Sequence, residues 1–315
     1  MICLGIDTSC YTTSVALADE LGPVRSERRL LPVRTGDTGL RQSDAVFLHV
    51  RQLPELMEQL FRNAEERPDC VCASVSPRAD EGSYMPVFLA GAGMGRSIAA
   101  AFHIPFYQTT HQMGHLRAAR VDSGLESERF LALHLSGGTT DVLLCEGERV
   151  RQLGTCLDLH AGQLVDRIGV LLGQPFPAGP YMEKLAEGTD AKGLVPSTVS
   201  GASCHLSGAE TKLKQLSGSL TPAELSAETY DVLCRTILKM LENAAKETGV
   251  RQALLFGGVM SSLRLRRLCQ ERIEKRRIPL DLYFGKPELS GDNAVGVALA
   301  GLSLNQQRQS IERMV

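Results

Sequence analysis

The sequence predicts an α/β protein with two lobes related by duplication. Two observations carry this prediction: a strand–turn–strand signature that occurs twice, and an order of elements that repeats around it. The signature spans residues 5–17 and again residues 133–144. In each copy an apolar strand ends in glycine or hydroxylated residues, and a second strand begins at a Thr-Thr pair. Small residues let backbone N–H groups approach a phosphate closely, so the two turns predict a duplicated nucleotide site.

Hydrophobic alternation and the placement of turn residues define the first lobe. The predicted elements are, in chain order, a three-stranded meander at 2–8, 13–19 and 23–31, a helix near 43–64, a buried strand at 70–75, a helix near 89–102 and a strand that ends around Thr109.

The second lobe repeats this βββαβα order. Its predicted elements are a meander at 129–136, 139–146 and 149–157, helices near 161–173 and 222–248, a strand at 253–256, a helix near 261–276, a strand at 280–284 and a last helix from about residue 292. The polar stretch 120–128 suggests lobes of residues 1–125 and 126–315, with the last helix crossing back to the first lobe. Residues 188–206 have no counterpart in the first copy and are interpreted as an insertion.

Composition limits the possible classes of function. A chain of 315 residues with 43% hydrophobic and 22% charged residues can form two globular cores. The formal net charge of -2 does not indicate a strongly basic or acidic partner. Any surface that binds nucleic acid must therefore be a local patch. Nine cysteines without a C-x-x-C pair suit a reducing compartment. Without an apolar run of about 18 residues or a signal-like N-terminus, we expect a cytoplasmic protein with no membrane partner.

Two histidines indicate a metal site. His111 and His115 are four residues apart, and Thr109-Thr110 can cap a helix that begins there, so both imidazoles project from one helix face. The pair can share a divalent ion once a third ligand is supplied, although two such histidines can also simply face solvent. A zincin-type protease is excluded, because that motif needs a glutamate beside the first histidine and Gln112 occupies the position.

A second group of residues indicates a nucleotide site. Phosphate donors are predicted from the turn Ser136, Gly137, Gly138 and Thr139, and a flat surface for an adenine from Gly257-Gly258. Asp166 and Glu183 are placed to accept hydrogen bonds from ribose hydroxyls, with Gly179 leaving room between them. The chain contains no P-loop, and the glycines at 91–95 lack the dinucleotide-binding spacing.

These motifs, in this order, resemble the TsaD/Gcp family of tRNA threonylcarbamoyl transferases, and the resemblance extends from Gly5 to Ala300. The family's E-T-S-C-D-D-T-S is similar to residues 7–14, its H-x-x-x-H to His111–His115, and its S-G-G-H-T to residues 136–140. Further similar blocks lie at 166–180, at 204–211, at 257–266, which includes Ser262 of the adenosine block, and at 291–294.

The resemblance implies a fold, a reaction and a set of ligands. The fold would be the two-lobed, ribonuclease H-like fold of the actin-like ATPases. The reaction would be transfer of a threonylcarbamoyl group from threonylcarbamoyl-AMP to N6 of adenosine 37 in tRNA. One divalent ion, zinc or iron, would be held by His111, His115 and Asp292. An adenine nucleotide, either threonylcarbamoyl-AMP or ATP, would occupy the nucleotide site, and the candidate catalytic residues are Asp7, Tyr11 and Thr12 at the first turn.

Departures from the family pattern keep two other functions open. Tyr11 and Thr12 replace two acidic residues, a longer loop at 76–86 replaces G-P-G-L, Thr139 replaces the usual histidine, and Ser262 replaces an asparagine. Either the substrate differs or catalysis is relaxed. The alternatives are carbamoyl or acyl transfer to a different acceptor, and a nucleotide-binding partner subunit without catalysis.

Partner surfaces are only weakly indicated. A basic segment at 264–277 can contact tRNA phosphates or can form an ordinary solvated helix face. The resemblance implies a same-fold partner subunit (TsaB-like), docked on first-lobe helices, and a small ATPase (TsaE-like). A homodimer is the alternative.

Overall fold

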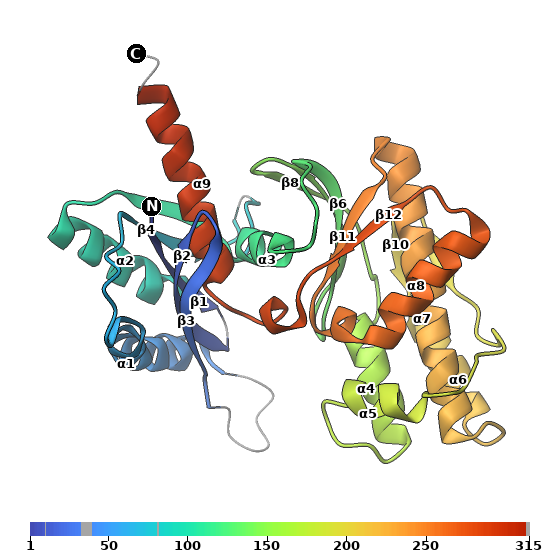
Figure 1. The fold of residues 1–315 in the computed structure, drawn as a ribbon. Coiled ribbons are helices and arrows are strands. Elements are labelled where there is room, and N and C mark those ends of the chain that lie inside the picture. The colour runs from blue at the N-terminus through green and yellow to red at the C-terminus, as the bar shows by residue number, and fades with distance from the viewer. Residues whose placement is uncertain (10, 33–39, 81, 313–315) are drawn as a thin grey trace. The chain divides into compact units, whose positions relative to one another are not determined.

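The computed structural model describes all residues except 10, 33–39, 81 and 313–315 (Figure 1). The chain forms two compact units. Unit 1 contains Met1–Val121 and Gly291–Val315, and unit 2 contains Asp122–Ser290. The division falls after Val121, four residues before the boundary expected from the sequence, and the last helix, which was expected to cross back to the first lobe, belongs to unit 1.

Unit 1 is built on a five-stranded sheet in the order β3-β2-β1-β4-β5. Its strands are β1 (Cys3–Ser9), β2 (Thr12–Asp19), β3 (Gly22–Leu30), β4 (Cys70–Ser76) and β5 (Phe106–Thr110). Strand β1 pairs antiparallel with β2 and parallel with β4, which in turn is parallel to β5. The helices are α1 (Gln42–Phe61), α2 (Phe88–Phe102), α3 (His111–Arg120) and α9 (Val295–Glu312).

Successive side chains of the central strands point to opposite faces of the sheet, and each face packs against different helices. Leu4 and Ile6 pack in one cluster with residues of α1 and α2. Cys3 packs in another with residues of α9. Gly5 lies directly against α9, because a Cβ there would overlap the backbone at Ala294 and Ala298. In Figure 1, α9 runs beside the strands of unit 1 although it comes last in the chain.

Unit 2 repeats this pairing. Its five-stranded sheet has the order β12-β11-β6-β7-β8, with strands β6 (Arg129–Leu135), β7 (Thr140–Glu146), β8 (Arg149–Thr155), β11 (Gln252–Phe256) and β12 (Asp281–Phe284). Strand β6 is antiparallel to β7 and parallel to β11, as β1 is to β2 and β4. The predicted duplication of the βββαβα order is therefore confirmed.

The helices of unit 2 enclose the larger core and include elements that the sequence analysis did not predict. The long helices are α4 (Ala161–Leu171), α7 (Pro222–Thr248) and α8 (Leu263–Arg276), with 3₁₀ turns η1 (Gly258–Ser261) and η2 (Pro287–Leu289). Unpredicted are α5 (Gly179–Leu185), the hairpin of β9 (Thr198–Ser200) and β10 (Ser203–His205), and α6 (Ser207–Leu216). The segment without a counterpart in unit 1 thus extends well beyond the predicted insertion. Among the described helices, none is long and apolar enough to cross a membrane.

Candidate functional site

The histidine pair lies at the start of α3 in unit 1. Thr110 caps this helix, since its Oγ1 accepts a hydrogen bond from the backbone N–H of Met113 at 3.1 Å. His111 and His115 are therefore one helical turn apart on one face, as predicted from their spacing. The ligand candidate from the other end of the chain, Asp292, comes just before α9.

A glycine contact brings α9 against α3. A side chain at Gly296 would overlap the carbonyl oxygen of Gly114, so the two helix backbones touch there. Gly114 directly precedes His115, and Gly296 is four residues after Asp292, near the start of α9. The close crossing therefore places the carboxylate beside both imidazoles.

The three ligand candidates converge. The Nε2 atoms of His111 and His115 are 3.0 Å apart. Asp292 Oδ1 lies 3.5 Å from Nε2 of His111 and 3.3 Å from Nε2 of His115. All three ligand atoms fall within 4.8 Å of one another.

This arrangement fits a divalent metal ion. Ligand distances of about 2.0–2.1 Å in tetrahedral geometry separate neighbouring ligand atoms by roughly 3.3–3.4 Å, close to the three observed separations. Two imidazole nitrogens at 3.0 Å also need a proton or a cation between them, because their lone pairs repel. Two histidines and one carboxylate form a donor set that zinc and iron(II) both accept.

Asp7 lies behind His111 and orients it. Its buried carboxylate is 3.1 Å (Oδ2) and 3.2 Å (Oδ1) from Nδ1 of His111, and it accepts a short hydrogen bond from Ser74 Oγ. With a proton on Nδ1, the unprotonated Nε2 faces the other ligand candidates. Metal-binding histidines usually donate their other ring N–H to a carboxylate in this way. Asp7, predicted as a catalytic residue, thus contacts His111 and Ser74 in the structure.

The charges in this cluster are strongly coupled. Burial lowers the pKa of His111, but the carboxylates of Asp7 and Asp292 outweigh burial and raise that pKa to about 10. Burial raises the pKa of Asp292, yet its hydrogen bonds with His111 and His115 hold that pKa well below the usual range. The cluster is thus built around positive charge between carboxylates.

The remaining first-turn candidates flank this cluster differently. Thr12 Oγ1 donates to Asp292 Oδ2 at 3.3 Å, so Thr12 supports the carboxylate from the strand side. Tyr11 is 44% exposed, and its backbone carbonyl accepts from Leu31 N–H at 2.8 Å. Cys10, which belongs to the same motif, lies outside the described residues.

In unit 2 the glycine turn between β6 and β7 is open at its tip and supported underneath. Nothing lies within 4 Å of a Cβ built at Gly137 or Gly138. Ser136 Oγ accepts from Gly138 N–H at 3.3 Å, and Ser136 N–H donates to the carbonyl of Thr139 at 2.8 Å. Gly162, in the first turn of α4, abuts the same turn so closely that any side chain would overlap Gly137.

The second glycine pair adjoins this turn. Gly257 has a φ of +98°, and a Cβ there would overlap the carbonyl oxygen of Leu135, the last residue of β6. Glycine is required at this position on both grounds. The following Gly258 is exposed with open space around it, so it leaves a flat surface where β6 and β11 end.

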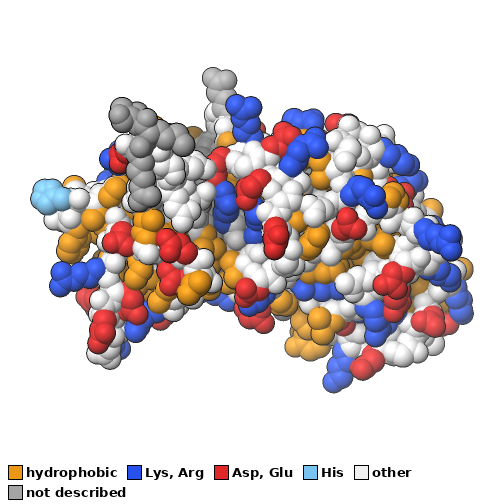
Figure 2. Space-filling view, turned by 45° about the horizontal axis from the view of Figure 1, so that its top comes forward, with side chains coloured by type: hydrophobic (Ala, Val, Ile, Leu, Met, Phe, Trp, Pro, Cys, Tyr) orange, Lys and Arg blue, Asp and Glu red, His pale blue; other side chains and the backbone are white. Residues whose placement is uncertain are grey.

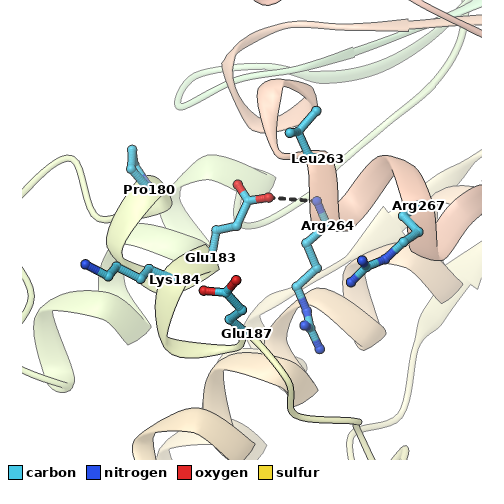
Figure 3. Close-up of a pocket in the computed structure, with 7 residues that line it drawn as sticks. All are labelled: Pro180, Glu183, Lys184, Glu187, Leu263, Arg264 and Arg267. Atoms are coloured by element: carbon cyan, nitrogen blue, oxygen red, sulfur yellow. Dashed lines mark hydrogen bonds between the residues drawn. The ribbon is translucent and has the colours of Figure 1, made fainter.

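The predicted ribose carboxylates lie around α5. Asp166 Oδ1 accepts from Ala178 N–H at 2.7 Å, just before Gly179 begins α5. Glu183 Oε1 accepts from Arg264 N–H at 2.7 Å, which ties α5 to the start of α8. Figure 3 shows Glu183 pointing toward that helix end. Each carboxylate therefore has one oxygen engaged by the protein.

A pocket of about 580 Å³ lies between α5 and α8 (Figure 3). Its lining residues are Pro180, Glu183, Lys184, Glu187, Leu263, Arg264 and Arg267. Ser262 borders the same helix start as its N-cap, because its Oγ accepts from Leu265 N–H at 3.2 Å.

Two functional candidates were not found from the sequence. The hydroxyl of Tyr230, on α7, donates to the carbonyl of Gly179 at 3.0 Å. Burial is the main reason that the pKa of Tyr230 is raised, and the negative charge of Glu183 adds to it. Ser74 supports Asp7. Both side chains lie inside regular elements without a glycine or histidine signature, so local patterns gave no signal for them.

Comparison with solved structures identifies the fold. HypF from T. kodakarensis matches with a TM-score of 0.62 at 16% identity, over 97% of this chain and 48% of the HypF chain. A ROK hexokinase from Thermus thermophilus matches with a TM-score of 0.57 at 13% identity, over 98% of this chain and all of the hexokinase chain. The activator of 2-hydroxyisocaproyl-CoA dehydratase from Clostridium difficile gives a TM-score of 0.53 at 16% identity, over 98% of this chain and 97% of that chain. The fold is that of the actin-like ATPases.

Comparison with sequences identifies the family. The profile of TsaD, tRNA N6-adenosine threonylcarbamoyltransferase, matches residues 38–299. Proteins of that name from Methanopyrus kandleri and Corynebacterium diphtheriae are each 30% identical to this chain. The matches cover 99% of this chain and 90% of the first relative, and 96% of this chain and 92% of the second. The chain therefore belongs to the TsaD family of tRNA N6-adenosine threonylcarbamoyltransferases.

Proposed function

We propose that this protein transfers a threonylcarbamoyl group from threonylcarbamoyl-AMP to N6 of adenosine 37 in tRNA, with a divalent ion held by His111, His115 and Asp292. The observation that carries the proposal is the convergence of these three ligand atoms within 4.8 Å in a chain of this family. A bound divalent ion would act as a Lewis acid toward carbamoyl or phosphate oxygens.

The residues of the chain have distinct roles in this proposal. Asp7 fixes the tautomer and direction of His111, and Thr12 steadies Asp292. In the turn at Ser136–Thr139 the N–H groups of Ser136 and Gly138 donate within the turn, so Gly137 N–H is the donor proposed for the adenylate phosphate. Asp166 and Glu183 orient the ribose with their remaining oxygens, and Gly258 leaves the flat surface for the adenine. Orientation of the leaving adenylate is the main contribution of these unit 2 residues.

The direct test is a transfer assay. Purified protein is incubated with threonylcarbamoyl-AMP and unmodified tRNA, and the digested nucleosides are examined by mass spectrometry. We expect N6-threonylcarbamoyladenosine with the unaltered protein and none with the His111→Ala, His115→Ala double variant. Absence of the product with metal-loaded, folded protein, when the assay succeeds with a TsaD relative, would contradict the proposal.

Tyr11 and Thr12 favour a second candidate, carbamoyl or acyl transfer to a different acceptor. A phenol and a hydroxyl stand where the family has two acidic residues, and the exposed Tyr11 is available to a substrate. A protein that consumes threonylcarbamoyl-AMP without modifying tRNA would support this candidate. A protein that binds the adenylate but never consumes it would instead be a non-catalytic partner subunit.

We also propose that a same-fold subunit docks on α1 and α2. The support is a set of large apolar side chains exposed on these helices: Phe47, Val50, Leu89 and Phe102. Sedimentation of the protein with a TsaB-like subunit and a TsaE-like ATPase should give a complex that Phe47→Glu weakens. A homodimer broken by the same change would favour self-association instead.

A further inference from the structure

The basic segment at 264–277 is not one uniform surface. Arg264 donates through both Nη atoms to the carbonyls of Ala186 and Thr189. Arg266 likewise donates to backbone carbonyls, those of Met260 and Gly285. These two arginines tie loops to α8 and are not available to a partner.

Other cations of α8 face α7. Arg272 Nη2 is 2.7 Å from Asp231 Oδ1, and Arg235 Nε of α7 is 2.8 Å from the other oxygen of Asp231. One carboxylate thus serves two arginines. Nη1 of Arg272 has no hydrogen-bond partner among the described residues.

One turn further along each helix lies a second cation. Lys239 follows Arg235 on α7, and Arg276 follows Arg272 on α8. Both are exposed and make no hydrogen bond or ion pair within the described part of the chain. The helices pack side by side, so the two i, i+4 pairs border one groove.

The groove has a volume of about 350 Å³, and the four cations line it together with Ser197 and Glu242. Four positive groups face two carboxylates, Glu242 at the groove and Asp231 beneath the arginines, which leaves an excess of positive charge. The formal net charge of the whole chain is -2, and on the face drawn in Figure 2 basic and acidic side chains are interspersed. The excess at the groove is therefore local.

We propose that the groove between α7 and α8 binds the phosphate backbone of RNA. Arg235 and Arg272 are held by Asp231, and Arg235 also donates to the carbonyl of Val195. Lys239 and Arg276, one on each helix and about 6 Å further along, are therefore the cations that can contact two phosphates of a polyanion. Guanidinium groups match phosphate oxygens in geometry as well as charge. The choice of RNA over another polyanion rests on the proposed function, in which tRNA is the acceptor.

The test changes the two cations that make no internal contacts. Binding of fluorescently labelled unmodified tRNA is followed by anisotropy between 50 and 300 mM KCl, for the full chain and for the variant Lys239→Gln, Arg276→Gln. Each lost phosphate contact should reduce the slope of log K against log salt by about 1, so we expect a reduction of about 2. In the transfer assay, KM for tRNA should rise with kcat preserved.

A charge-matched control is Arg149→Gln, Lys212→Gln, which alters two cations of unit 2 that do not line the groove. It should keep the salt slope of the unaltered protein. An unchanged slope and KM in the groove variant would overturn the inference while leaving the proposed function intact.

Two further outcomes distinguish a failure of the groove proposal from a failure of the proposed function. If the protein modifies no tRNA, the function fails, but tRNA binding that depends on Lys239 and Arg276 still supports the groove. If the groove variant loses binding to polyglutamate and keeps binding to tRNA, the groove serves an acidic protein and the inference is wrong.

Discussion

At the scale of single residues, the candidate ligand cluster of His111, His115 and Asp292 is supported by a carboxylate that is not itself one of the three ligand candidates. Asp7 contacts Nδ1 of His111, while Nε2 of the same ring faces His115 and Asp292. The carboxylate of Asp7 determines which ring nitrogen of His111 carries the proton. Metal affinity should therefore depend on the negative charge of the Asp7 side chain as well as on its shape.

Asp7→Asn tests this dependence. The amide keeps the size of the side chain but removes its charge, so divalent metal affinity should fall by about 10- to 100-fold. Affinity is measured by competition with a chromophoric chelator, alongside elemental analysis. Asp44→Asn, at an exposed site on α1, is the control and should leave affinity unchanged. Equal affinities in both variants would show that Asp7 does not orient His111.

Tyr11 and Thr12 set a second test at this scale. Thr12 donates to Asp292, so a carboxylate in its place would lie beside a carboxylate already bound to the histidines. In a relaxed transferase, Tyr11→Asp with Thr12→Asp should restore family charge and increase tRNA modification. In an enzyme specialised for another acceptor, the same pair should abolish the native activity. Nucleoside mass spectrometry with metal analysis distinguishes the two, and unaltered tRNA modification would show that the departures are neutral.

At the scale of elements, the metal cluster depends on the crossing of α3 and α9. Gly114 and Gly296 let the two helices touch, and we expect this contact to hold Asp292, just before α9, beside the histidines. A helix crossing formed by two glycines has no slack for a methyl group, because a backbone atom cannot move as a side chain can.

Gly296→Ala should therefore push α9 away from α3. We expect lower metal occupancy in a protein that still folds, together with a lower melting temperature. Gly93→Ala in α2 is the matched control, since nothing lies within 4 Å of a Cβ there and alanine favours a helix. Full occupancy in Gly296→Ala would mean that the crossing does not hold Asp292 in place.

The same scale shows what the sequence could and could not predict. The strands of both meanders and the His111–His115 spacing follow local periodicity, and they were predicted. Helices α5 and α6 are short and lie in a region rich in glycine and proline, where periodicity is weak, and they were missed. The contacts of Glu183 with Arg264 and of Asp7 with His111 join residues 81 and 104 positions apart. No local pattern encodes such pairs, so the carboxylates could be nominated but their partners could not.

At the scale of the whole molecule, one sheet topology is used twice with different residues at the strand ends. Each unit has a central strand that is antiparallel to one neighbour and parallel to the other. In unit 1 the strand residues Asp7 and Thr12 contact His111 and Asp292, and in unit 2 the turn between β6 and β7 is the open glycine turn supported by α4. The duplication preserved the scaffold while the residues at the strand ends diverged.

An adenine nucleotide bound at the unit 2 turn should stabilise the whole chain. Binding to the folded state alone contributes about 2.7 kcal/mol at a ligand concentration of 100 Kd, which a thermal shift detects. Gly138→Glu should lose this shift by repelling the phosphate, and the open space at that position lets the variant fold. Gly218→Glu, in an equally open loop, is the control and should keep the shift. A full shift in Gly138→Glu would place the nucleotide elsewhere.

The position of α9 also bears on how the protein matures in the cell. During synthesis His111 and His115 are made long before Asp292. Until α9 is also made, the face of β1 and β4 that carries Cys3 and Cys72 lacks the helix that covers it. Gly5 of β1 leaves room that the backbone of this late segment occupies, and Gly301 within α9 lets the helix lie close to Cys3 and Cys72. A nascent chain can thus fold unit 2 first and gain its third metal ligand in the same step that closes unit 1. Because the third candidate ligand, Asp292, is made late, binding of a metal ion by all three residues would require synthesis to have passed residue 292.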